Sequence, residues 1–285
     1  MRGRSPYRLS ISDATRRFSS GQRRAHDAVP CHCAGLSHSS WRCTPSIPAG
    51  PFSLGYGGQV AEPALVWSGR GCLVESHAMT DDVPSPIDYK RLSEAREWAA
   101  TAMLKRPWRV DFFAEFASAI KNSSLPVQRI LDLGSGPGFL AEYLLNAFPA
   151  INYVALDSSA AMHQLAVERI GLLGARVQFV ERNLREPEWM EGLRQFECVV
   201  TIQAVHELRH KRHARGLHEQ VRHLLVPEGQ YLVCDHFAGE GGLENSQLYM
   251  TMDEQRSTLI DAGFVGVSQV LIKDSLVLHR ALRQG

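Results

Sequence analysis

Short apolar runs that alternate with helical patterns constrain the fold of this 285-residue chain more than any other feature. Five such runs are present: Arg129–Leu133, Tyr153–Leu156, Val177–Val180, Cys198–Ile202 and Tyr231–Cys234. Runs that are apolar at nearly every position, instead of at alternate positions, are typical of parallel strands covered by helices on both faces. The pattern predicts an α/β fold built on a doubly wound, mostly parallel sheet.

The segments on either side of these runs complete the expected fold. Val265–Lys273 and Ser275–Arg280 are joined by a tight turn at Lys273-Asp274, so the sheet should end in an antiparallel hairpin and hold seven strands. Ahead of the first run, apolar residues recur at helical spacing in two stripes: Leu92, Ala95, Ala99 and Met103, then Phe112, Phe113, Phe116 and Ile120. We expect these N-terminal helices to form a lid or wall over the active site.

The first 78 residues differ in composition from the rest of the chain. They contain nine arginines and no lysine against four acidic residues, and Gly, Ser and Pro make up 27 of the 78. The other 207 residues carry 22 basic and 26 acidic side chains, so the net charge of +1 joins two unlike parts. Four of the six cysteines also lie in the leading part, whereas Cys198 and Cys234 are expected to be buried, apolar side chains.

Several interpretations of residues 1–78 are open. Cys31, His32 and Cys33 resemble metal ligands, but without paired Cys-x-x-Cys elements a zinc site is disfavoured. The first 25 residues are rich in arginine and serine, as in an organellar transit peptide. We favour the interpretation that translation starts at Met79 and that residues 1–78 are a mis-assigned extension, with a disordered tail as the alternative. The expected division is then 1–78 as extension, 79–126 as helical lid and 127–285 as the main domain of a cytoplasmic protein.

The most specific local signal is a glycine loop within residues 130–140. A strand is followed by Gly134, Gly136 and Gly138, and a helical pattern begins directly after them. Glycines at such a place let the backbone approach a ligand where any Cβ would clash. The dinucleotide fingerprint Gly-x-Gly-x-x-Gly would need a glycine at 139, where this chain has Phe139. The loop predicts a ligand site of another kind, with a purely structural turn as the alternative.

An acidic residue at the end of the next strand strengthens that prediction. Asp157 ends the run that begins at Tyr153. A carboxylate at this point can accept hydrogen bonds from both ribose hydroxyls of a ligand that contains adenosine. Its alternative role is a helix N-cap, but Ser158 and Ser159 already supply caps for the following helix.

With these residues the sequence resembles the class I S-adenosylmethionine-dependent methyltransferases, in their small-molecule branch, over roughly residues 127–280. The glycine loop and its preceding acid match the family's first motif, whose loop surrounds the methionine part of the cofactor. Asp157 matches the ribose-binding acid, and Asn183 stands where an adenine-contacting Asp is commoner. The resemblance implies S-adenosylmethionine as the cofactor, with contacts from Asp132, Gly134, Ser135, Gly136, Gly138, Asp157, Ser158, Asn183, Leu184 and Gln203.

Three later segments extend the resemblance, with departures from the family pattern. Residues 196–208 match the fourth strand and the loop after it, although Glu197 stands where Asp is usual. Residues 224–229 match the turn before the fifth strand, with Glu228 in place of the usual glycine. Residues 262–264 match the end of the last helix. Five matching segments in order are a far more specific signal than one loop.

Candidate catalytic residues follow the fourth and fifth strands, where open α/β sheets bind ligands. These are His206, Asp235 and His236. A histidine with a near-neutral pKa suits the removal of a proton from a hydroxyl or amine. Alternatively, His206 starts a helix and packs beneath the cofactor. We expect Glu207 to be a first-turn acid that the helix dipole stabilises.

The histidines at 206, 210 and 213 have the spacing of one helical face, which invites a metal hypothesis. Apolar residues such as Leu217 and Val221 continue the same stripe, so we predict no metal. A nucleic-acid partner is also disfavoured. Thr201–Ala204 lacks the Asp/Asn-Pro-Pro-aromatic motif of base methyltransferases, and no large basic surplus is present. The basic residues Lys211, Arg212 and Arg215 are expected to be solvated.

The sequence therefore predicts an S-adenosylmethionine-dependent methyltransferase that acts on oxygen, nitrogen or carbon of a small molecule. No run of about 18 apolar residues is present, so no membrane span is expected. A non-catalytic S-adenosylmethionine-binding module and an RNA methyltransferase stay open as alternatives. A nicotinamide oxidoreductase is disfavoured by Phe139 and by the absence of a Tyr-x-x-x-Lys pair. No residue indicates the methyl acceptor or the oligomeric state.

Overall fold

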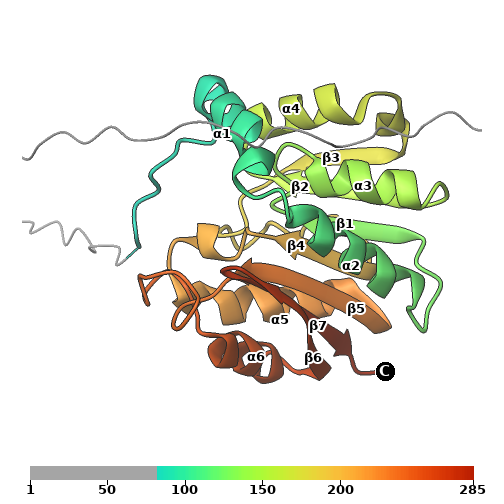
Figure 1. Ribbon diagram of the computed structural model, residues 1–285. Helices are drawn as coiled ribbons and strands as arrows, with labels where there is room; N and C mark the ends of the chain where they lie inside the picture. The colour runs from blue at the N-terminus through green and yellow to red at the C-terminus, as the bar shows by residue number, and fades with distance from the viewer. Residues whose placement is uncertain (1–81) are drawn as a thin grey trace, which may run out of the picture. The chain divides into compact units, whose positions relative to one another are not determined.

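The computed structural model describes residues 82–285 (Figure 1). The interpretations of residues 1–78, including the start at Met79, the transit peptide and the cysteine-rich zinc site, lie outside this range. Within residues 82–285, no helix combines the length and the apolar character that crossing a membrane requires.

A seven-stranded sheet in the order β3-β2-β1-β4-β5-β7-β6 forms the centre of the described residues. Its strands are β1 (Arg129–Leu133), β2 (Asn152–Asp157), β3 (Val177–Glu181), β4 (Phe196–Ile202), β5 (Leu225–His236), β6 (Phe264–Lys273) and β7 (Leu276–Arg283). Pairings among the first five strands are parallel, and β7 runs antiparallel to both β5 and β6. The predicted mostly parallel sheet with a C-terminal antiparallel hairpin is confirmed.

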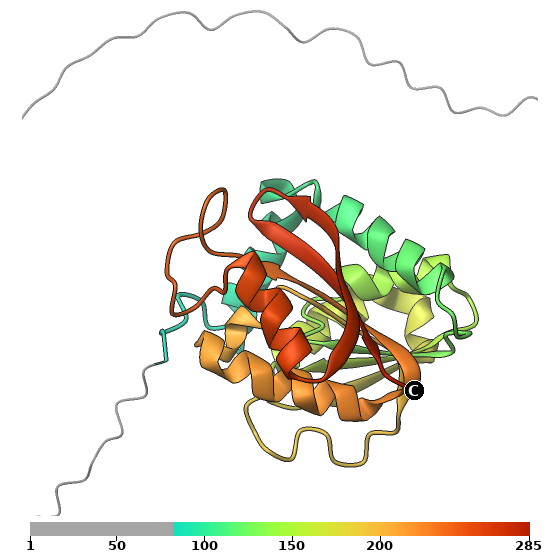
Figure 2. The same cartoon turned by 90° about the horizontal axis from the view of Figure 1, so that it is seen from below.

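Helices cover both faces of this sheet, as Figures 1 and 2 show. The α-helices are α1 (Leu92–Lys105), α2 (Arg109–Lys121), α3 (Phe139–Ala147), α4 (Ala160–Ile170), α5 (Ala214–Leu224) and α6 (Met252–Asp261). Buried residues of α2, α3 and α4 share one apolar cluster with the sheet, and buried residues of α5 and α6 share the other. The fold therefore has three layers, helices–sheet–helices.

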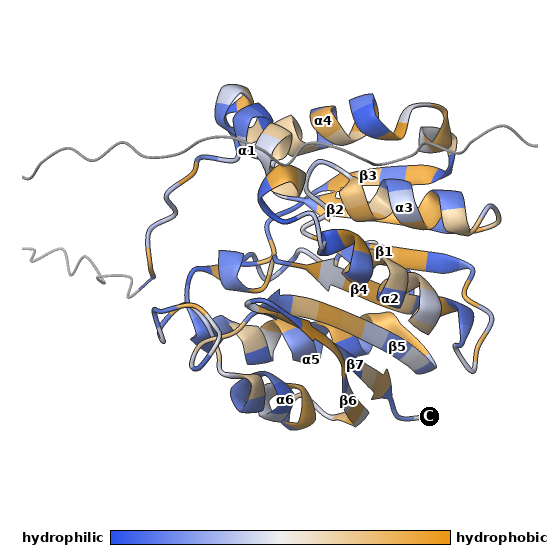
Figure 3. Ribbon diagram, viewed as in Figure 1, coloured by the Kyte–Doolittle hydropathy of each residue, from blue (hydrophilic) through white to orange (hydrophobic). Residues whose placement is uncertain are grey.

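Alternation within single strands explains the two cores. In β1, Ile130 belongs to the cluster with α2 and α3, whereas its neighbour Leu131 belongs to the cluster with α5, and neither is exposed. Successive side chains of a strand point to opposite faces, so a strand between two helical layers has to be apolar throughout. Figure 3 shows this pattern as hydrophobic colour along the strands and mixed colour along the helices. Cys198 and Cys234 are buried free thiols, as predicted.

The two N-terminal helices have different places in the fold. The apolar stripe of α2, with Phe112, Phe116 and Ile120, packs into the layer beside α3. Helix α1 buries Ala95 and Ala99 against α4 instead, and it lines the cavity described below. Of the residues predicted as a helical lid, α1 and the chain before it line the cavity, while most of α2 belongs to the core.

The turn expected before the fifth strand is instead part of that strand. Residues 225–236 are continuous β5, and the pairing with β4 shifts register between Phe196 and Cys198. Glu228, at the usual glycine position, has a φ of 61° in the left-handed region. At Gly229 a Cβ would lie 2.8 Å from the carbonyl oxygen of Val226. At the register shift between β4 and β5, this chain therefore has its glycine at position 229, one residue after the position where the family usually has one.

The expected helix that carries three histidines on one face is wrong. His206–Leu208 and Lys211–His213 are separate 3-10 turns, and α5 begins only at Ala214. Arg209 lies between the turns with a φ of 67°, a left-handed conformation that ends a helix. The prediction for Glu207 fails with the helix, because no α-helix begins at this residue. The buried stripe of α5, Leu217, Val221 and Leu224, is confirmed.

Candidate functional site

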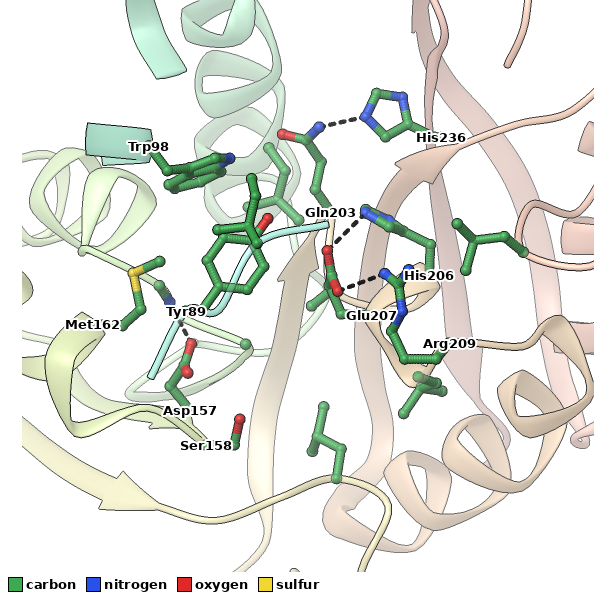
Figure 4. A pocket seen from close by; sticks show the side chains of 18 of the residues that line it. Tyr89, Trp98, Asp157, Ser158, Met162, Gln203, His206, Glu207, Arg209 and His236 are labelled. Atoms are coloured by element: carbon green, nitrogen blue, oxygen red, sulfur yellow. Dashed lines mark hydrogen bonds and ion pairs between the residues drawn. The ribbon is translucent and has the colours of Figure 1, made fainter. Parts of the chain in front are cut away.

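A cavity of about 680 Å³ lies at the carboxyl ends of the parallel strands. The cavity lies beside β1 and β4, where the strand order changes direction. Open α/β sheets have a crevice at this point, because the connections on its two sides run to opposite faces of the sheet. Figure 4 shows Asp157, Ser158 and Met162 on one side of the cavity and Gln203, His206 and His236 on the other, with Tyr89 beside Met162 and Trp98 above Met162. We call these sides the loop end and the histidine end.

The glycine loop between β1 and α3 forms the floor of the loop end. Gly134 and Gly136 line the cavity with φ angles of 66° and 55°. A Cβ on Gly134 would lie 2.3 Å from the Cβ of Ala204, which no real pair of atoms tolerates. Gly138 serves another contact, because its Cβ position is 3.1 Å from Ala166 of α4. Two of the three glycines therefore shape the cavity and the third permits close helix packing.

Asp157 ties this loop to the end of β2. Its Oδ2 accepts a 2.8 Å hydrogen bond from the backbone N–H of Gly136, and its Oδ1 accepts one of 3.0 Å from Ser159. Burial raises the pKa of Asp157, while these hydrogen bonds and His163 act in the opposite direction. The carboxylate lines the cavity, and each oxygen keeps a second lone pair for a ligand. Ser158 lines the cavity beside it, and Ser159 caps α4, as predicted.

Asp132, in β1, and Ser135, within the loop, are buried outside the cavity lining. Asp132 is 1% exposed and accepts a 2.8 Å hydrogen bond from the Tyr153 hydroxyl. Burial raises its pKa to about 7, even though the Tyr153 hydrogen bond lowers it. Its Oδ1 and the Ser135 hydroxyl have no partner among the described residues. Asp132 and Ser135 therefore do not line the cavity, whereas Asn183 and Leu184, after β3, do.

The histidine end centres on Asp235, a buried carboxylate at the end of β5. Asp235 accepts three hydrogen bonds: 2.5 Å from His206 Nδ1, 2.7 Å from the His206 backbone and 2.7 Å from the His236 backbone. Burial raises the pKa of Asp235, but the His206 contacts outweigh it and lower the pKa. On the other side of the ring, His206 Nε2 lies 3.4 Å from Glu207 Oε1. The imidazole is therefore held between two carboxylates.

The two histidines of this end take opposite protonation states. Burial lowers the pKa of His206, but Asp235 and Glu207 outweigh that effect and raise it to about 10. In His236, burial dominates and lowers the pKa to about 4, with Asp235 opposing. At neutral pH, His206 is a charged hydrogen-bond donor and His236 is a neutral imidazole. Pairs of groups whose environments separate their pKa values in this way can exchange protons with a shared ligand.

Gln203 and Ser275 hold the His236 ring in place. The Gln203 amide lies 2.6 Å from His236 Nε2, and the Ser275 hydroxyl lies 3.0 Å from Nδ1. The Gln203 backbone has a φ of 59°, which aims its side chain into the cavity. Its Oε1 is buried without a partner among residues 82–285, so it is available to a ligand.

Comparisons with known proteins agree with this geometry. Residues 130–229 match the family model described as a methyltransferase domain. These residues form a methyltransferase domain. The predicted class I S-adenosylmethionine-dependent family is confirmed, and S-adenosylmethionine is the cofactor of that family. No curated protein matches the sequence.

Solved structures resemble the methyltransferase domain and its helical layers at low sequence identity. An O-methyltransferase family protein from Burkholderia thailandensis is 19% identical with a TM-score of 0.54, over 68% of this chain and 60% of that one. Human N-acetylserotonin methyltransferase, solved with SAM, is 17% identical with a TM-score of 0.54, over 69% and 58%. A putative methyltransferase from Haloferax volcanii, solved with its activator Trm112, is 15% identical with a TM-score of 0.54, over 70% and 98%. The chain thus spans about 60% of the first two proteins, and the likeness shows the fold.

The segment predicted as a helical lid begins, among the described residues, with a stretch before α1 that borders the cavity of the methyltransferase domain. Residues 82–91 cross its mouth, and Arg209 fixes them: its Nε donates 2.8 Å to the carbonyl of Val83 and its Nη2 donates 2.7 Å to that of Pro84. The Val83 N–H in turn donates to the carbonyl of Arg209. This segment places Tyr89 over the cavity. No periodic pattern marks it, because an extended segment held by one distant arginine leaves none.

Tyr249 lines the cavity, although the sequence did not indicate it as a site residue. Its ring centroid lies 5.5 Å from that of His206 and 5.9 Å from that of His236, and these two are 5.4 Å apart. The three rings form an aromatic wall at the histidine end. Tyr249 comes from the connection between β5 and α6, which has no regular structure from which its direction could be predicted.

The basic cluster predicted to be solvated is paired with acids. Lys211 contacts Glu254, Arg212 contacts Asp82, and Arg215 contacts Glu219. Residues 82–285 contain no group of three or more potential ligands arranged for a metal ion. The rings of His210 and His213 lie 6.4 Å apart, on different turns from His206.

Proposed function

We propose that this protein is an S-adenosylmethionine-dependent methyltransferase whose acceptor is the oxygen, nitrogen or carbon of a small molecule. The observation that carries the proposal is one cavity with two unlike ends. The loop end offers backbone groups and a carboxylate, and the histidine end offers two imidazoles in opposite protonation states. Such a cavity has room for a nucleoside-like cofactor and for a second molecule beside it.

The residues of the loop end fit the cofactor. Gly134 provides a cradle that a side chain would fill, and Asp157 offers its free lone pairs to ribose hydroxyls. Asn183 and Leu184 would contact the adenine, with Met162 against its face. The buried, unpartnered Oε1 of Gln203 is a hydrogen-bond acceptor for the amino group of the methionine part. When bound, S-adenosylmethionine supplies an electrophilic methyl group on a sulfonium.

The histidine end would bind the acceptor and manage its proton. His206, held through Nδ1 by Asp235, donates a hydrogen bond from Nε2 in place of its contact with Glu207. This stabilises an acceptor oxygen or nitrogen as that atom loses its proton, and neutral His236 accepts the proton at Nε2 in place of its hydrogen bond from the Gln203 amide. General acid–base help of this kind contributes about 10²–10⁴-fold. Alignment of the two reactants contributes about 7–11 kcal/mol.

Enclosure of the cavity supports a small acceptor. The 82–91 segment and α1 cover it, and Arg209 fixes that cover. The paired basic residues at 211, 212 and 215 have carboxylates in contact, which leaves them poor partners for phosphates.

Calorimetry with the full-length chain tests the cofactor site. We expect S-adenosylhomocysteine to bind and Asp157→Ala to weaken it by at least tenfold, because the variant loses both the ribose contact and the tie to Gly136. Asp261→Ala, an exposed acid at the end of α6, is the matched control and should bind as the wild type does. Wild-type protein that binds neither S-adenosylmethionine nor S-adenosylhomocysteine would refute the proposal.

A second measurement separates an enzyme from a non-catalytic binding module. We expect transfer of label from methyl-labelled S-adenosylmethionine to a nuclease-treated pool of small metabolites. Label that reaches only RNA in an untreated pool would point to RNA methylation. Binding without transfer to any pool would favour the non-catalytic module.

A further inference from the structure

Arg109 is a buried arginine that faces the cavity without an acidic partner. It stands at the start of α2, it is 4% exposed, and it lines the cavity beside α1. Its Nε is buried with no hydrogen-bond partner in residues 82–285, and no ion pair to its guanidinium is found there. Every other arginine of the cavity wall keeps some exposed surface, and Arg109 is the one among them that is fully buried.

The surroundings of Arg109 do not neutralise its charge. Its guanidinium lies over the Trp98 ring, 5.5 Å from the centroid, which is a cation–π contact. Burial and the neighbouring Arg106 lower the pKa of Arg109 to about 10, so the group is still charged at neutral pH. The remaining groups that act on it are Cys234 and Tyr89, whose own pKa values are raised, and which are therefore neutral.

A second arginine stands beside the first, toward the histidine end. Arg106 is the C-cap residue of α1 and also lines the cavity. Arg106, Arg109, His236 and Tyr249 line the same cavity, and the charge of Arg106 lowers the pKa of His236. The carboxylates of the wall, Asp157 and Glu207, are already engaged by the glycine loop and by His206 and Arg209.

An unpaired buried charge destabilises a protein unless a ligand supplies the opposite charge. A guanidinium presents two parallel N–H donors that match the two oxygens of a carboxylate. Aromatic rings of Trp98, Tyr89 and Tyr249 border the same space and fit a planar body attached to that carboxylate.

We propose that Arg109, supported by Arg106, binds the carboxylate of the methyl acceptor, so that the substrate is a small carboxylic acid whose nucleophilic atom reaches His206 and His236. This inference rests on the proposed function. It names the substrate class of the same cavity.

Benzoate and its neutral isostere benzamide test the assignment by titration into the full-length protein saturated with S-adenosylhomocysteine. The wild type should bind benzoate at least tenfold more tightly than benzamide. Arg109→Gln should weaken benzoate at least tenfold and leave benzamide unchanged, while Arg109→Lys, which keeps the charge, should fall between. Equal binding of the two probes by the wild type, or unchanged benzoate binding by Arg109→Gln, would overturn the proposal.

Two controls separate the possible sources of the effect. Arg96→Gln removes an exposed arginine of α1 that pairs with Glu168, and it should bind both probes as the wild type does. The methionine part of the cofactor also carries a carboxylate. If Arg109→Gln weakened S-adenosylhomocysteine but not 5′-methylthioadenosine, which lacks that carboxylate, Arg109 would hold the cofactor and the proposal would be overturned. Wild-type protein that binds no S-adenosylhomocysteine would refute the proposed function itself.

Discussion

The two ends of the cavity are built in different ways. At the loop end, one short segment after β1 supplies the floor, its left-handed positions are Gly134, Gly136 and Gly138, and the contacts use the backbone. At the histidine end, the left-handed positions are Gln203 and Arg209, which carry side chains that hold His236 and the covering segment. The first end depends on the absence of side chains and the second on their presence.

This difference indicates which substitutions would affect cofactor binding and which would affect acceptor specificity. A Cβ at Gly134 would collide with the Cβ of Ala204, so a substitution there disturbs the whole loop end. Side chains at the histidine end come from α1, α2, β5 and the connections around them. Each can change without moving the backbone that binds the cofactor, so acceptor specificity can vary on a constant cofactor site.

The largest effect is expected from a side chain at Gly134. Gly134→Ala places a Cβ 2.3 Å from that of Ala204 and keeps a left-handed backbone, and the two costs together are roughly 2–5 kcal/mol. We expect S-adenosylhomocysteine affinity to fall by about 30-fold or more in calorimetry. Gly174→Ala, where the added Cβ meets nothing within 4 Å, should bind normally. An unaffected Gly134→Ala would show that the loop end does not depend on the missing side chain.

At the histidine end, Asp235→Asn should lower the pKa of His206 and leave the cofactor site intact. Without the Asp235 carboxylate only Glu207 opposes the effect of burial, so the pKa of His206 should fall from about 10 toward its ordinary 6.5. Imidazole resonances in a nuclear magnetic resonance pH titration measure this change, and S-adenosylhomocysteine affinity should change less than twofold.

The same variant has a defined effect on stability. Folding raises the pKa of His206, so the contribution of this group to the free energy of unfolding is complete below pH 6.5 and is lost as the pH rises toward 10. Folding lowers the pKa of Asp235, so the contribution of this group is present above pH 3.8 and is lost at lower pH. Asp235→Asn should destabilise the protein most between pH 4 and 6.5. A constant difference up to pH 10 would contradict the ion pair.

Asp132→Asn tests whether the buried carboxyl of Asp132, in the strand before the glycine loop, is stabilised in its neutral form. Folding raises the pKa of Asp132 from 3.8 to about 7, so wild-type stability should decline as the pH rises through this range. Asn, which has the same shape and no charge, should flatten that decline by at least about 1 kcal/mol in urea unfolding at pH 5 and pH 8. Parallel pH profiles of the two proteins would show that Asp132 is not the group responsible.

The smallest effect concerns the strain at Gln203. With a φ of 59°, Gln203→Gly should be more stable than Gln203→Ala by about 1 kcal/mol, since only glycine adopts this conformation freely. Thermal unfolding measures the difference. Ala114→Gly, in the exposed interior of α2, should show the opposite sign. If glycine destabilised both positions, the left-handed backbone at Gln203 would not be strained.

Much of the architecture could be predicted because it depends on local patterns. All seven strands lie within a few residues of their apolar runs, and Ser159 caps α4 as expected. The histidine helix failed because Arg209 adopts a left-handed backbone, which spacing alone does not reveal. The resemblance also implied cofactor contacts from both Asp132 and Asp157, although Asp132 is buried outside the cavity lining and Asp157 lines the cavity.

The sequence by itself determined the mostly parallel sheet, its C-terminal antiparallel hairpin and the glycine loop, because apolar periodicity and glycine spacing act over neighbouring residues. Only the tertiary structure decided which charged groups meet. The contact of Asp235 with His206, the cover of residues 82–91 held by Arg209, and the isolation of Arg109 each join segments far apart in the chain. Burial then sets their protonation, and burial is a property of the packed molecule.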